Sequence, residues 1–221
     1  MSLVVIGTGT EVGKTVTCAL LLARYGKSFR LGYWKPIATG AIEGRDTAEV
    51  KRWCGHLADI LEESYLFDAP LSPHLAAKLE GKSIDPARVA DALVMHGMED
   101  ERRSLIIEGI GGLLVPLTDH GYLLADLLRD FQLPCLVVGQ SKLGTINHTL
   151  LTLEALRWRK IEIAGVVLSG PRNRENRAAI RRFGRVDVVL EIEPIRPLSR
   201  RGVARAARKF DRPGRLRGYF L

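Results

Sequence analysis

Short runs dominated by apolar residues recur along the chain, and within them apolar positions do not alternate with polar ones. The runs are 3–6, 31–35, 104–108, 134–139, 163–168 and, more weakly, 186–190. An alternating strand has one face in water, whereas a continuous apolar run is covered on both faces, which is typical of parallel strands. We therefore interpret these runs as the strands of one central, mostly parallel sheet.

Segments with apolar residues at helical spacing separate the runs. They are 16–25, 47–54, 74–79, 86–96, 123–131, 145–158, 174–183 and 203–210. Asp46 fits the N-cap of the second segment, and residues 37–45 are expected to form a loop. Strands that alternate with helices predict an α/β fold with helices on both faces of the sheet. A length of 221 residues suits one domain, which we take to be 1–221.

The first apolar run leads directly into a glycine-rich stretch. Residues 7–15 read Gly-Thr-Gly-Thr-Glu-Val-Gly-Lys-Thr and precede a predicted helix. In that setting, backbone N–H groups and the positive helix end bind phosphate, a lysine reaches the β- and γ-phosphates, and a hydroxyl can ligate Mg²⁺. The loop is one residue longer than the common form. We predict a single-domain P-loop NTPase fold that binds ATP or another nucleoside triphosphate through Gly9, Thr10, Glu11, Val12, Gly13, Lys14, Thr15 and Val16.

Further charged side chains are expected at the same edge of the sheet. Lys35 and Glu108 end two of the predicted strands, and Asp46 follows Lys35 by eleven positions. Ligands of open parallel sheets bind beyond the carboxyl ends of the strands. Thr15, Asp46 and Glu108 offer a hydroxyl and two carboxylates, which is a sufficient protein share for Mg²⁺. Glycines after Glu108 leave space for a ligand, so the predicted nucleotide site also includes Asp46, Glu108, Gly109, Ile110 and Gly111.

A second lysine beside a phosphate site could neutralise charge that appears only during phosphoryl transfer. Lys35 also fits an ordinary surface lysine, and Asp46 fits a plain helix cap. Glu108 could likewise be a strand-end carboxylate that caps a nearby helix. The sequence alone leaves these alternatives open.

The net charge of +8 is concentrated in the C-terminal part of the chain. From 172 to 217 there are fifteen Lys and Arg against five Asp and Glu, so the remainder carries −2. No nucleic-acid-binding motif accompanies these charges, and no apolar run is long enough to span a bilayer. A solvated helix face that attracts an anionic cofactor explains the charge more simply than nucleic acid or a membrane. We expect segment 172–221 to pack on the domain at the side of the nucleotide base.

The cysteines and the N-terminal residues predict a cytoplasmic protein. Cys18, Cys54 and Cys135 lie far apart and form no Cys-x-x-Cys pair, which is typical of reduced core residues. No basic lead-in precedes the first apolar run, so we expect no secretory signal peptide.

Taken together, five segments resemble the dethiobiotin synthetases of biotin synthesis. In order along the chain they are 7–15, 35–40, Asp46, 108–113 and 142–148. They cover residues 1 to about 170 and are more specific as a set than a phosphate loop alone. The resemblance implies a ligase that forms the ureido ring of dethiobiotin from 7,8-diaminononanoate and CO2. Nucleoside triphosphate hydrolysis would drive the reaction through a carbamate and a carbamic-phosphoric anhydride.

The resemblance also implies roles for individual residues. Lys14 and Lys35 would be catalytic, stabilising the carbamate and the moving phosphoryl group, and Glu11 would lie close to substrate and nucleotide. The start of the helix 145–158 would hold the distant carboxylate of the substrate, and it would do so across a homodimer interface. The residues expected to bind the substrate are Thr39, Gly144, Thr145 and Asn147.

The resemblance fades after residue 170. Many members of the family carry an asparagine at the end of the late strand that contacts the adenine ring, where this chain has Ser169. Phosphate and metal binding do not depend on the base, so we expect the reaction to be retained with ATP or another nucleoside triphosphate.

Three other functions are compatible with parts of the sequence. A partitioning ATPase of the ParA or MinD type would use the basic C-terminal face, but it carries a lysine early in the loop, where this chain has Gly9. An amidating synthetase of cobalamin synthesis would need an amidotransferase domain with a nucleophilic cysteine. A nucleoside or shikimate-type kinase could use the arginines of 172–185 as a lid, but it would leave Lys35 and the segment 108–112 without a role.

Overall fold

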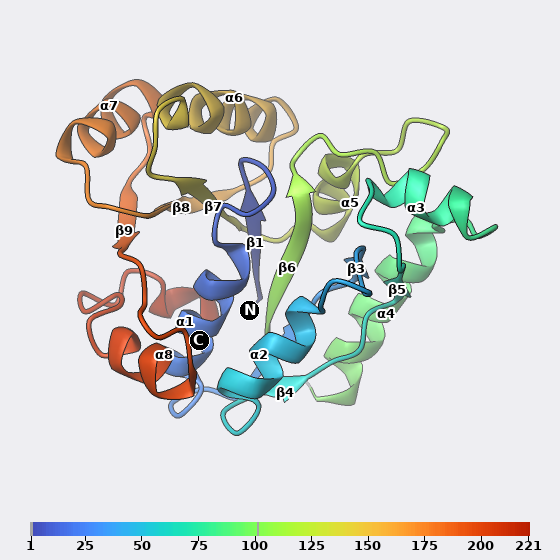
Figure 1. The fold of residues 1–221 in the computed structure, drawn as a ribbon, viewed down its shortest axis with the longest axis horizontal. Helices are drawn as coiled ribbons and strands as arrows, with labels where there is room; N and C mark the ends of the chain where they lie inside the picture. Colours follow the sequence, from blue (N-terminus) through green and yellow to red (C-terminus); the bar gives the residue numbers. More distant parts are fainter. Residues whose placement is uncertain (1, 101) are drawn as a thin grey trace.

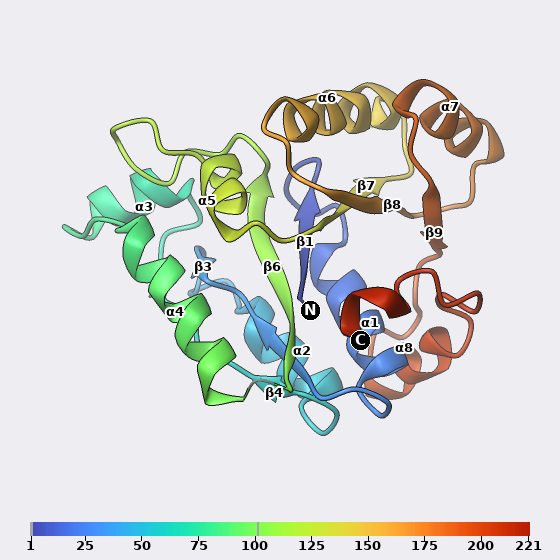
Figure 2. The same cartoon turned by 180° about the vertical axis from the view of Figure 1, so that it is seen from behind.

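A seven-stranded sheet forms the centre of the computed structural model, which describes residues 2–100 and 102–221 (Figures 1 and 2). The strand order is β4-β2-β6-β1-β7-β8-β9, and every pairing that defines this order is parallel. The strands are β1 (Leu3–Gly7), β2 (Leu31–Trp34), β4 (Asp59–Ile60), β6 (Ser104–Gly112), β7 (Cys135–Gln140), β8 (Ile163–Ser169) and β9 (Val188–Ile192). The predicted α/β fold with a central parallel sheet is therefore confirmed.

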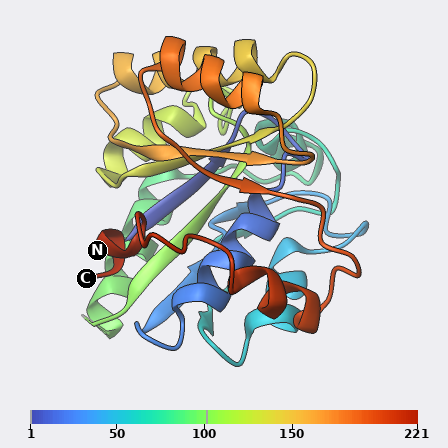
Figure 3. The same ribbon diagram turned by 90° about the vertical axis from the view of Figure 1, so that its left-hand side faces the viewer.

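Helices cover both faces of the sheet, which lies between them in the side view of Figure 3. One face carries α1 (Lys14–Tyr25), α2 (Asp46–Cys54), α8 (Arg200–Ala207) and the short 3-10 helix η1 (Arg217–Phe220). The other carries α3 (Pro73–Leu79), α4 (Pro86–Glu99), α5 (Leu124–Phe131), α6 (Thr145–Trp158) and α7 (Arg174–Gly184). None of the helices among the described residues is both long and apolar enough to cross a membrane.

Strand β1 shows why the apolar runs are continuous. Leu3 and Val5 point into the core formed with α1, whereas Val4 and Ile6 point into the core formed with α5. All four side chains are completely buried. A strand in this position needs apolar residues on both faces, so the run in the sequence has no polar alternation.

The connections of the sheet direct the loops toward one crevice. Helix α1 links β1 to β2 across β6 on one face, and α5 links β6 to β7 across β1 on the other. The chain thus leaves β1 and β6 in opposite directions. In parallel sheets, such a switch of direction opens a ligand-binding crevice beyond the carboxyl ends of the two strands.

Strand β6 is longer than the sequence predicts. It continues to Gly112, so Glu108 lies inside the strand and does not end it. Gly112 pairs with Gly7 beyond an irregularity in the β1–β6 register, and a Cβ on Gly112 would lie 3.6 Å from the Cα of Gly9. The glycines therefore allow the strand to continue beside the phosphate loop, beyond the end predicted at Glu108.

Several smaller expectations are also corrected. Arg45, not Asp46, occupies the N-cap of α2, and Asp46 is the first helical residue. Residues 37–45 are not entirely loop, because β3 (Ile37–Ala38) pairs with β5 (Tyr65–Leu66). The last predicted helix, 203–210, is replaced by α8, which begins at Arg200 and ends at Ala207.

The segment that follows α8 packs against α1. The Tyr25 hydroxyl, near the end of α1, donates a hydrogen bond to the carboxylate of the fully buried Asp211. That carboxylate also accepts hydrogen bonds from the backbone N–H groups of Arg215 and Leu216, at 2.9 and 2.8 Å. Asp211 therefore joins the C-terminal segment to the helix that begins at the phosphate loop.

Candidate active site

The phosphate loop connects the end of β1 at Gly7 to the start of α1 at Lys14. Gly13 has a φ of +99°, a conformation that glycine adopts without the steric cost of a side chain. Glu11 has a φ of +54°, which is uncommon for a residue with a side chain, and its side chain is exposed. The loop therefore has the compact, partly left-handed backbone that is expected of a phosphate-binding nest.

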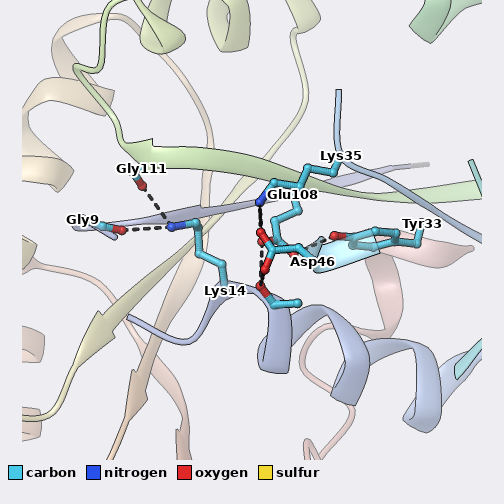
Figure 4. Close-up of polar contacts among 8 residues, drawn as sticks. Gly9, Lys14, Tyr33, Lys35, Asp46, Glu108 and Gly111 are labelled. Atoms are coloured by element: carbon cyan, nitrogen blue, oxygen red, sulfur yellow. Dashed lines mark hydrogen bonds and ion pairs between the residues drawn. The ribbon is translucent and has the colours of Figure 1, made fainter. Parts of the chain in front are cut away.

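The Lys14 side chain crosses the mouth of this loop. Its Nζ donates hydrogen bonds to the carbonyl oxygens of Gly9, at 3.0 Å, and Gly111, at 3.2 Å (Figure 4). The loop and the end of β6 thus hold one ammonium group between them. Burial lowers the pKa of Lys14, the negative charge of Glu108 opposes that effect, and the positive charge of Lys35 adds to it, so that the pKa lies below its ordinary value.

Four side chains converge beside the start of α1. The Thr15 hydroxyl lies 3.0 Å from Asp46 Oδ1 and 2.9 Å from Glu108 Oε1. Lys35 Nζ donates to Glu108 Oε1 at 3.0 Å and to Asp46 Oδ2. Lys35 and Glu108 are only 4% and 1% exposed. Lys35 is therefore not a surface lysine, and Asp46 and Glu108 are not simple helix caps.

Electrostatics stabilise the charged forms in this cluster. Burial by itself lowers the pKa of Lys35, but Glu108 and Asp46 more than offset it and hold the pKa above its ordinary value. Burial raises the pKa of Asp46, but the charge and the hydrogen bonds of Lys35 and Thr15 bring it below its ordinary value. The site thus combines an ammonium group with an ionised carboxylate at neutral pH.

The oxygen atoms of Thr15, Asp46 and Glu108 suit a small divalent cation. Mg²⁺ takes oxygen ligands in an octahedron at about 2.0–2.1 Å, so neighbouring ligands lie about 3 Å apart. The Thr15 oxygen lies at that separation from one oxygen of each carboxylate. The Thr15 hydroxyl has a single proton, so it can donate a hydrogen bond to only one of the two carboxylates at a time. The donor set therefore fits Mg²⁺, although the described residues contain no cluster of three His, Cys, Asp or Glu suited to a metal.

The structure adds one residue that the sequence analysis missed. The Tyr33 hydroxyl donates a 2.9 Å hydrogen bond to Glu108 Oε2, the oxygen that faces away from Thr15 and Lys35 (Figure 4). Its spacing of two positions from Lys35 is consistent with one face of a strand, but the contact with Glu108 depends on how β2 pairs with β6, which the spacing does not give.

The other residues predicted to contact the nucleotide differ in position. Thr10 is exposed, Val12 packs into the core around α1, and Val16 lies at its border. A Cβ on Gly109 would contact Ile6 and Leu124 at 3.4 Å, so this glycine faces the core on the far side of the sheet from Glu108. Ile110 borders the same far core.

The residues predicted to bind the substrate lie on two elements near the loop. Gly144 has a φ of +89° and forms the N-cap of α6, and Thr145 and Asn147 lie in the first turn. A cleft of about 230 Å³ separates this helix start from the phosphate loop and is lined by Thr8, Gly9, Thr10, Val12, Gln140, Lys142, Leu143, Thr145 and His148. Thr39 is half-buried just after β3.

Fold and site together define a P-loop nucleotide-binding protein. The family model of the AAA domain matches residues 1–201. Among solved structures, a ParA family ATPase from Chlorobium tepidum superposes with a TM-score of 0.62 over 97% of each chain at 12% identity, a likeness of fold alone.

Curated relatives narrow the class to one family. The ATP-dependent dethiobiotin synthetase BioD of Paramagnetospirillum magneticum is 43% identical over 86% of this chain and 87% of its own length. The protein of that name from Agrobacterium fabrum is 44% identical over 86% and 88%. This chain therefore belongs to the ATP-dependent dethiobiotin synthetase family, a family of ligases.

Proposed function

We propose that this protein closes the ureido ring of dethiobiotin, using 7,8-diaminononanoate, CO2 and a nucleoside triphosphate. The observation that carries the proposal is the convergence of Lys14 and Lys35 with Thr15, Asp46 and Glu108 beside the phosphate loop. A simple hydrolase of the triphosphate has no evident need for a second, buried lysine. A carboxylated amine that receives a phosphoryl group does need it, because negative charge develops on both partners.

The reaction proceeds in three steps: carboxylation of one amine, phosphorylation of the carbamate, and ring closure. One amine of the substrate adds to CO2, forms a C–N bond and releases a proton, which gives the carbamate. A carbamate oxygen then attacks the γ-phosphorus and expels the nucleoside diphosphate, which gives the mixed anhydride. The second amine attacks the carbamate carbon and expels phosphate, and loss of its proton leaves the cyclic urea.

The two lysines have separate roles in these steps. Lys14 lies in the loop and stabilises the phosphoryl oxygens, whereas Lys35 contacts the carbamate and the phosphoryl group as charge moves between them. Glu11 is exposed at the loop and lies close to the substrate amine and the nucleotide. Thr39, which follows β3, donates a hydrogen bond to the carbamate.

Thr15, Asp46 and Glu108 would hold Mg²⁺. The ion supplies neutralisation of the negative charge on the phosphate oxygens when it is bound. Lys35 forms ion pairs with both of these carboxylates. A cation held by these three residues would compete with Lys35 for the two carboxylates, which would leave the charge of Lys35 available to the substrate.

The start of α6 is the proposed clamp for the distant carboxylate of the substrate. Gly144, Thr145 and Asn147 lie at the positive end of a 14-residue helix, which favours an anion. The Thr145 N–H is already bonded to the carbonyl oxygen of Lys142 at 3.1 Å, so Thr145 would contribute its side-chain hydroxyl. We propose that the clamp acts across a homodimer interface, since Leu143 beside it is fully exposed to solvent. The aliphatic chain of the substrate links the two ends of the site.

The base of the nucleotide is proposed to lie toward the C-terminal segment. A cleft of about 330 Å³ there includes the residues Glu193, Pro194 and Ile195 and the side chain of Arg205. Ser169 ends β8 beside the phosphate loop, where a Cβ on Gly13 would lie 2.6 Å from its Oγ. A serine there offers a short side chain for base contact, so we propose loose selection among nucleoside triphosphates.

The alternative of a partitioning ATPase is supported by fold alone. It assigns no role to Lys35, whereas the ligase does. We propose that the protein acts in the cytoplasm on small molecules, without nucleic acid or membrane as partners.

One incubation tests the proposal directly. Purified protein is mixed with bicarbonate, 7,8-diaminononanoate, Mg²⁺ and ATP, CTP or GTP in turn, and the product is identified by mass. Dethiobiotin and one phosphate per turnover are expected, and the rates rank the bases. Triphosphate hydrolysis that does not depend on the diamine, without dethiobiotin, would refute the proposal.

A further inference from the structure

Tyr33 is completely buried, yet its ring carries a hydroxyl group into the core. It points to the α1 side of β2, toward the core that also contains Leu31, whereas Trp34 points to the other side. Strand β2 pairs with β6 so that Tyr33 lies opposite Ile106, two positions before Glu108. The ring therefore extends along the sheet and reaches the Glu108 carboxylate from the side opposite the phosphate loop (Figure 4).

The two oxygens of Glu108 have different surroundings. Oε1 lies 2.9 Å from the Thr15 hydroxyl and 3.0 Å from Lys35 Nζ. Oε2 accepts the hydrogen bond from Tyr33. The Cys18 thiol also lies beside Glu108, but a thiol is a weak donor. Tyr33 is thus the strong donor to Oε2, and it fixes the plane of the carboxylate, so that the opposite oxygen faces Thr15 and Lys35.

Because Glu108 is buried, its hydrogen bond with Tyr33 favours one orientation of the carboxylate. A carboxylate that is 1% exposed gains little from water, so an Oε2 without Tyr33 would lack a strong partner in the core. The carboxylate would then rotate and share its oxygens among Thr15 and Lys35. A phenol hydroxyl has one proton to donate, and Glu108 Oε2 is the acceptor of that proton at 2.9 Å.

We propose that Tyr33 is a positioning residue that orients Glu108 so that Oε1 is presented to the divalent cation. The inference rests on the proposed role of Glu108 as a metal ligand. Residues that hydrogen-bond a metal ligand typically change metal affinity by about 10–100-fold when they are removed. Tyr33 itself contacts neither substrate nor nucleotide in this assignment.

The test measures how strongly a metal enhances nucleotide binding. Affinity for a non-hydrolysable ATP analogue is determined by calorimetry with Mn²⁺ and with EDTA, in wild type, Tyr33→Phe and Tyr25→Phe. Tyr25→Phe is the matched control, because it removes another buried tyrosine–carboxylate bond, to Asp211, on the far end of α1. Thermal unfolding of all three reports the loss of stability separately.

We expect Tyr33→Phe to reduce the Mn²⁺ enhancement about tenfold or more and to leave the affinity in EDTA unchanged. Tyr25→Phe should leave both unchanged. In a Glu108→Gln background, Tyr33→Phe should have no further effect on the enhancement, because Tyr33 acts through Glu108. If Mn²⁺ enhances binding as strongly in Tyr33→Phe as in wild type, the inference about Tyr33 is overturned and the proposed function is not affected. If Mn²⁺ gives no enhancement in wild type, the proposed metal role of Glu108 is refuted as well.

A second measurement does not depend on removing the hydroxyl. With 3-fluorotyrosine inserted at position 33 by amber suppression, the fluorine resonance of the nucleotide-bound protein should shift when Mg²⁺ is added. The same label at position 25 should not shift. A resonance at position 33 that ignores Mg²⁺ would contradict a contact with a metal-bound carboxylate.

Discussion

Lys35 carries its positive charge in a position that is almost closed to water. A buried ammonium group is costly unless opposite charges compensate it, and Glu108 and Asp46 do so at the same point. Such a pairing offsets the cost of burying the charge, and it places a positive charge next to the phosphate loop. At the scale of a single residue, the ion pairs that hold Lys35 in the fold therefore also position its charge for the reaction.

Replacing Lys35 should separate these two contributions. Lys35→Ala is expected to lower kcat about 100-fold or more, because the charge that compensates the moving phosphoryl group is lost. Steady-state kinetics with the diamine and ATP measure it, and circular dichroism checks the fold. Lys82→Ala is the control, since Lys82 forms an exposed ion pair with Glu80. Near-normal turnover of Lys35→Ala would exclude the residue from the mechanism.

Lys14 gives nucleotide binding a pH dependence. Its pKa in the free protein lies below the ordinary value of 10.5 because of burial, and a bound triphosphate should raise it. Between the two values the complex holds more protons than the free protein, so binding should take up protons there. Affinity should accordingly fall as pH rises through that interval.

Calorimetry in two buffers of different ionisation enthalpy, at a series of pH values below 10.5, measures this uptake. Lys14→Arg serves as the control, because a guanidinium group keeps its proton in this range and the uptake from position 14 should vanish. Uptake that is equal in Lys14→Arg and wild type would assign the proton to another group.

At the scale of elements, α1 connects the phosphate loop to the C-terminal segment. Lys14 and Thr15 begin the helix, and Tyr25 ends it against Asp211. The segment that follows α8 packs its apolar side chains on the same helix, including Leu216 and Phe220. The basic composition of this segment thus conceals an apolar inner face that supports the helix of the active site.

Asp211→Ala should therefore reduce stability more than chemistry. The substitution leaves the Tyr25 hydroxyl and two backbone N–H groups without their acceptor, at a cost of about 1–3 kcal/mol for each group that stays buried. Urea unfolding should show a lower free energy of unfolding, while kcat of the folded fraction stays within about threefold. Asp119→Ala, at an exposed position, is the control. A stable Asp211→Ala enzyme that loses only nucleotide binding would refute the structural role.

At the scale of the whole molecule, the strands that are buried on both faces of the sheet could be predicted from the sequence. The central strands leave continuous apolar runs, so β1, β7 and β8 could be found from sequence. Strands β4 and β5 contain two residues each and leave no period to detect. The glycines of 109–112 were expected to leave space for a ligand after the strand, and Gly112 also lets β6 continue close to the loop.

The residues of the candidate site that belong to a sequence motif could be predicted. The contact that depends on how two strands pair could not. Lys14, Thr15 and Lys35 are recognisable by their spacing from glycine and proline. The bond from Tyr33 to Glu108 joins residues 75 positions apart, and it depends on how β2 and β6 pair. No pattern along the chain records that register, so coordinates were needed to find it.

An apolar stripe on α6 suggests how two copies of the whole molecule meet. Leu151 and Trp158 are separated by seven positions, which puts them on one side of α6, and they are 56% and 80% exposed. Leu143, which is 101% exposed, immediately precedes the helix. Clusters of exposed apolar side chains of this kind mark interaction surfaces. A homodimer through α6 would also bring the proposed carboxylate clamp of one copy close to its partner.

Sedimentation equilibrium should therefore find a dimer, and Leu151→Glu should weaken its association at least tenfold by placing a charge within the interface. If the clamp acts across the interface, KM for the diamine should rise more than KM for ATP. Leu79→Glu, on α3 and 70% exposed, is the control for adding a charge to an exposed apolar position. A wild-type monomer with full activity at the same concentration would contradict the shared site, because one copy would then complete the reaction without its partner.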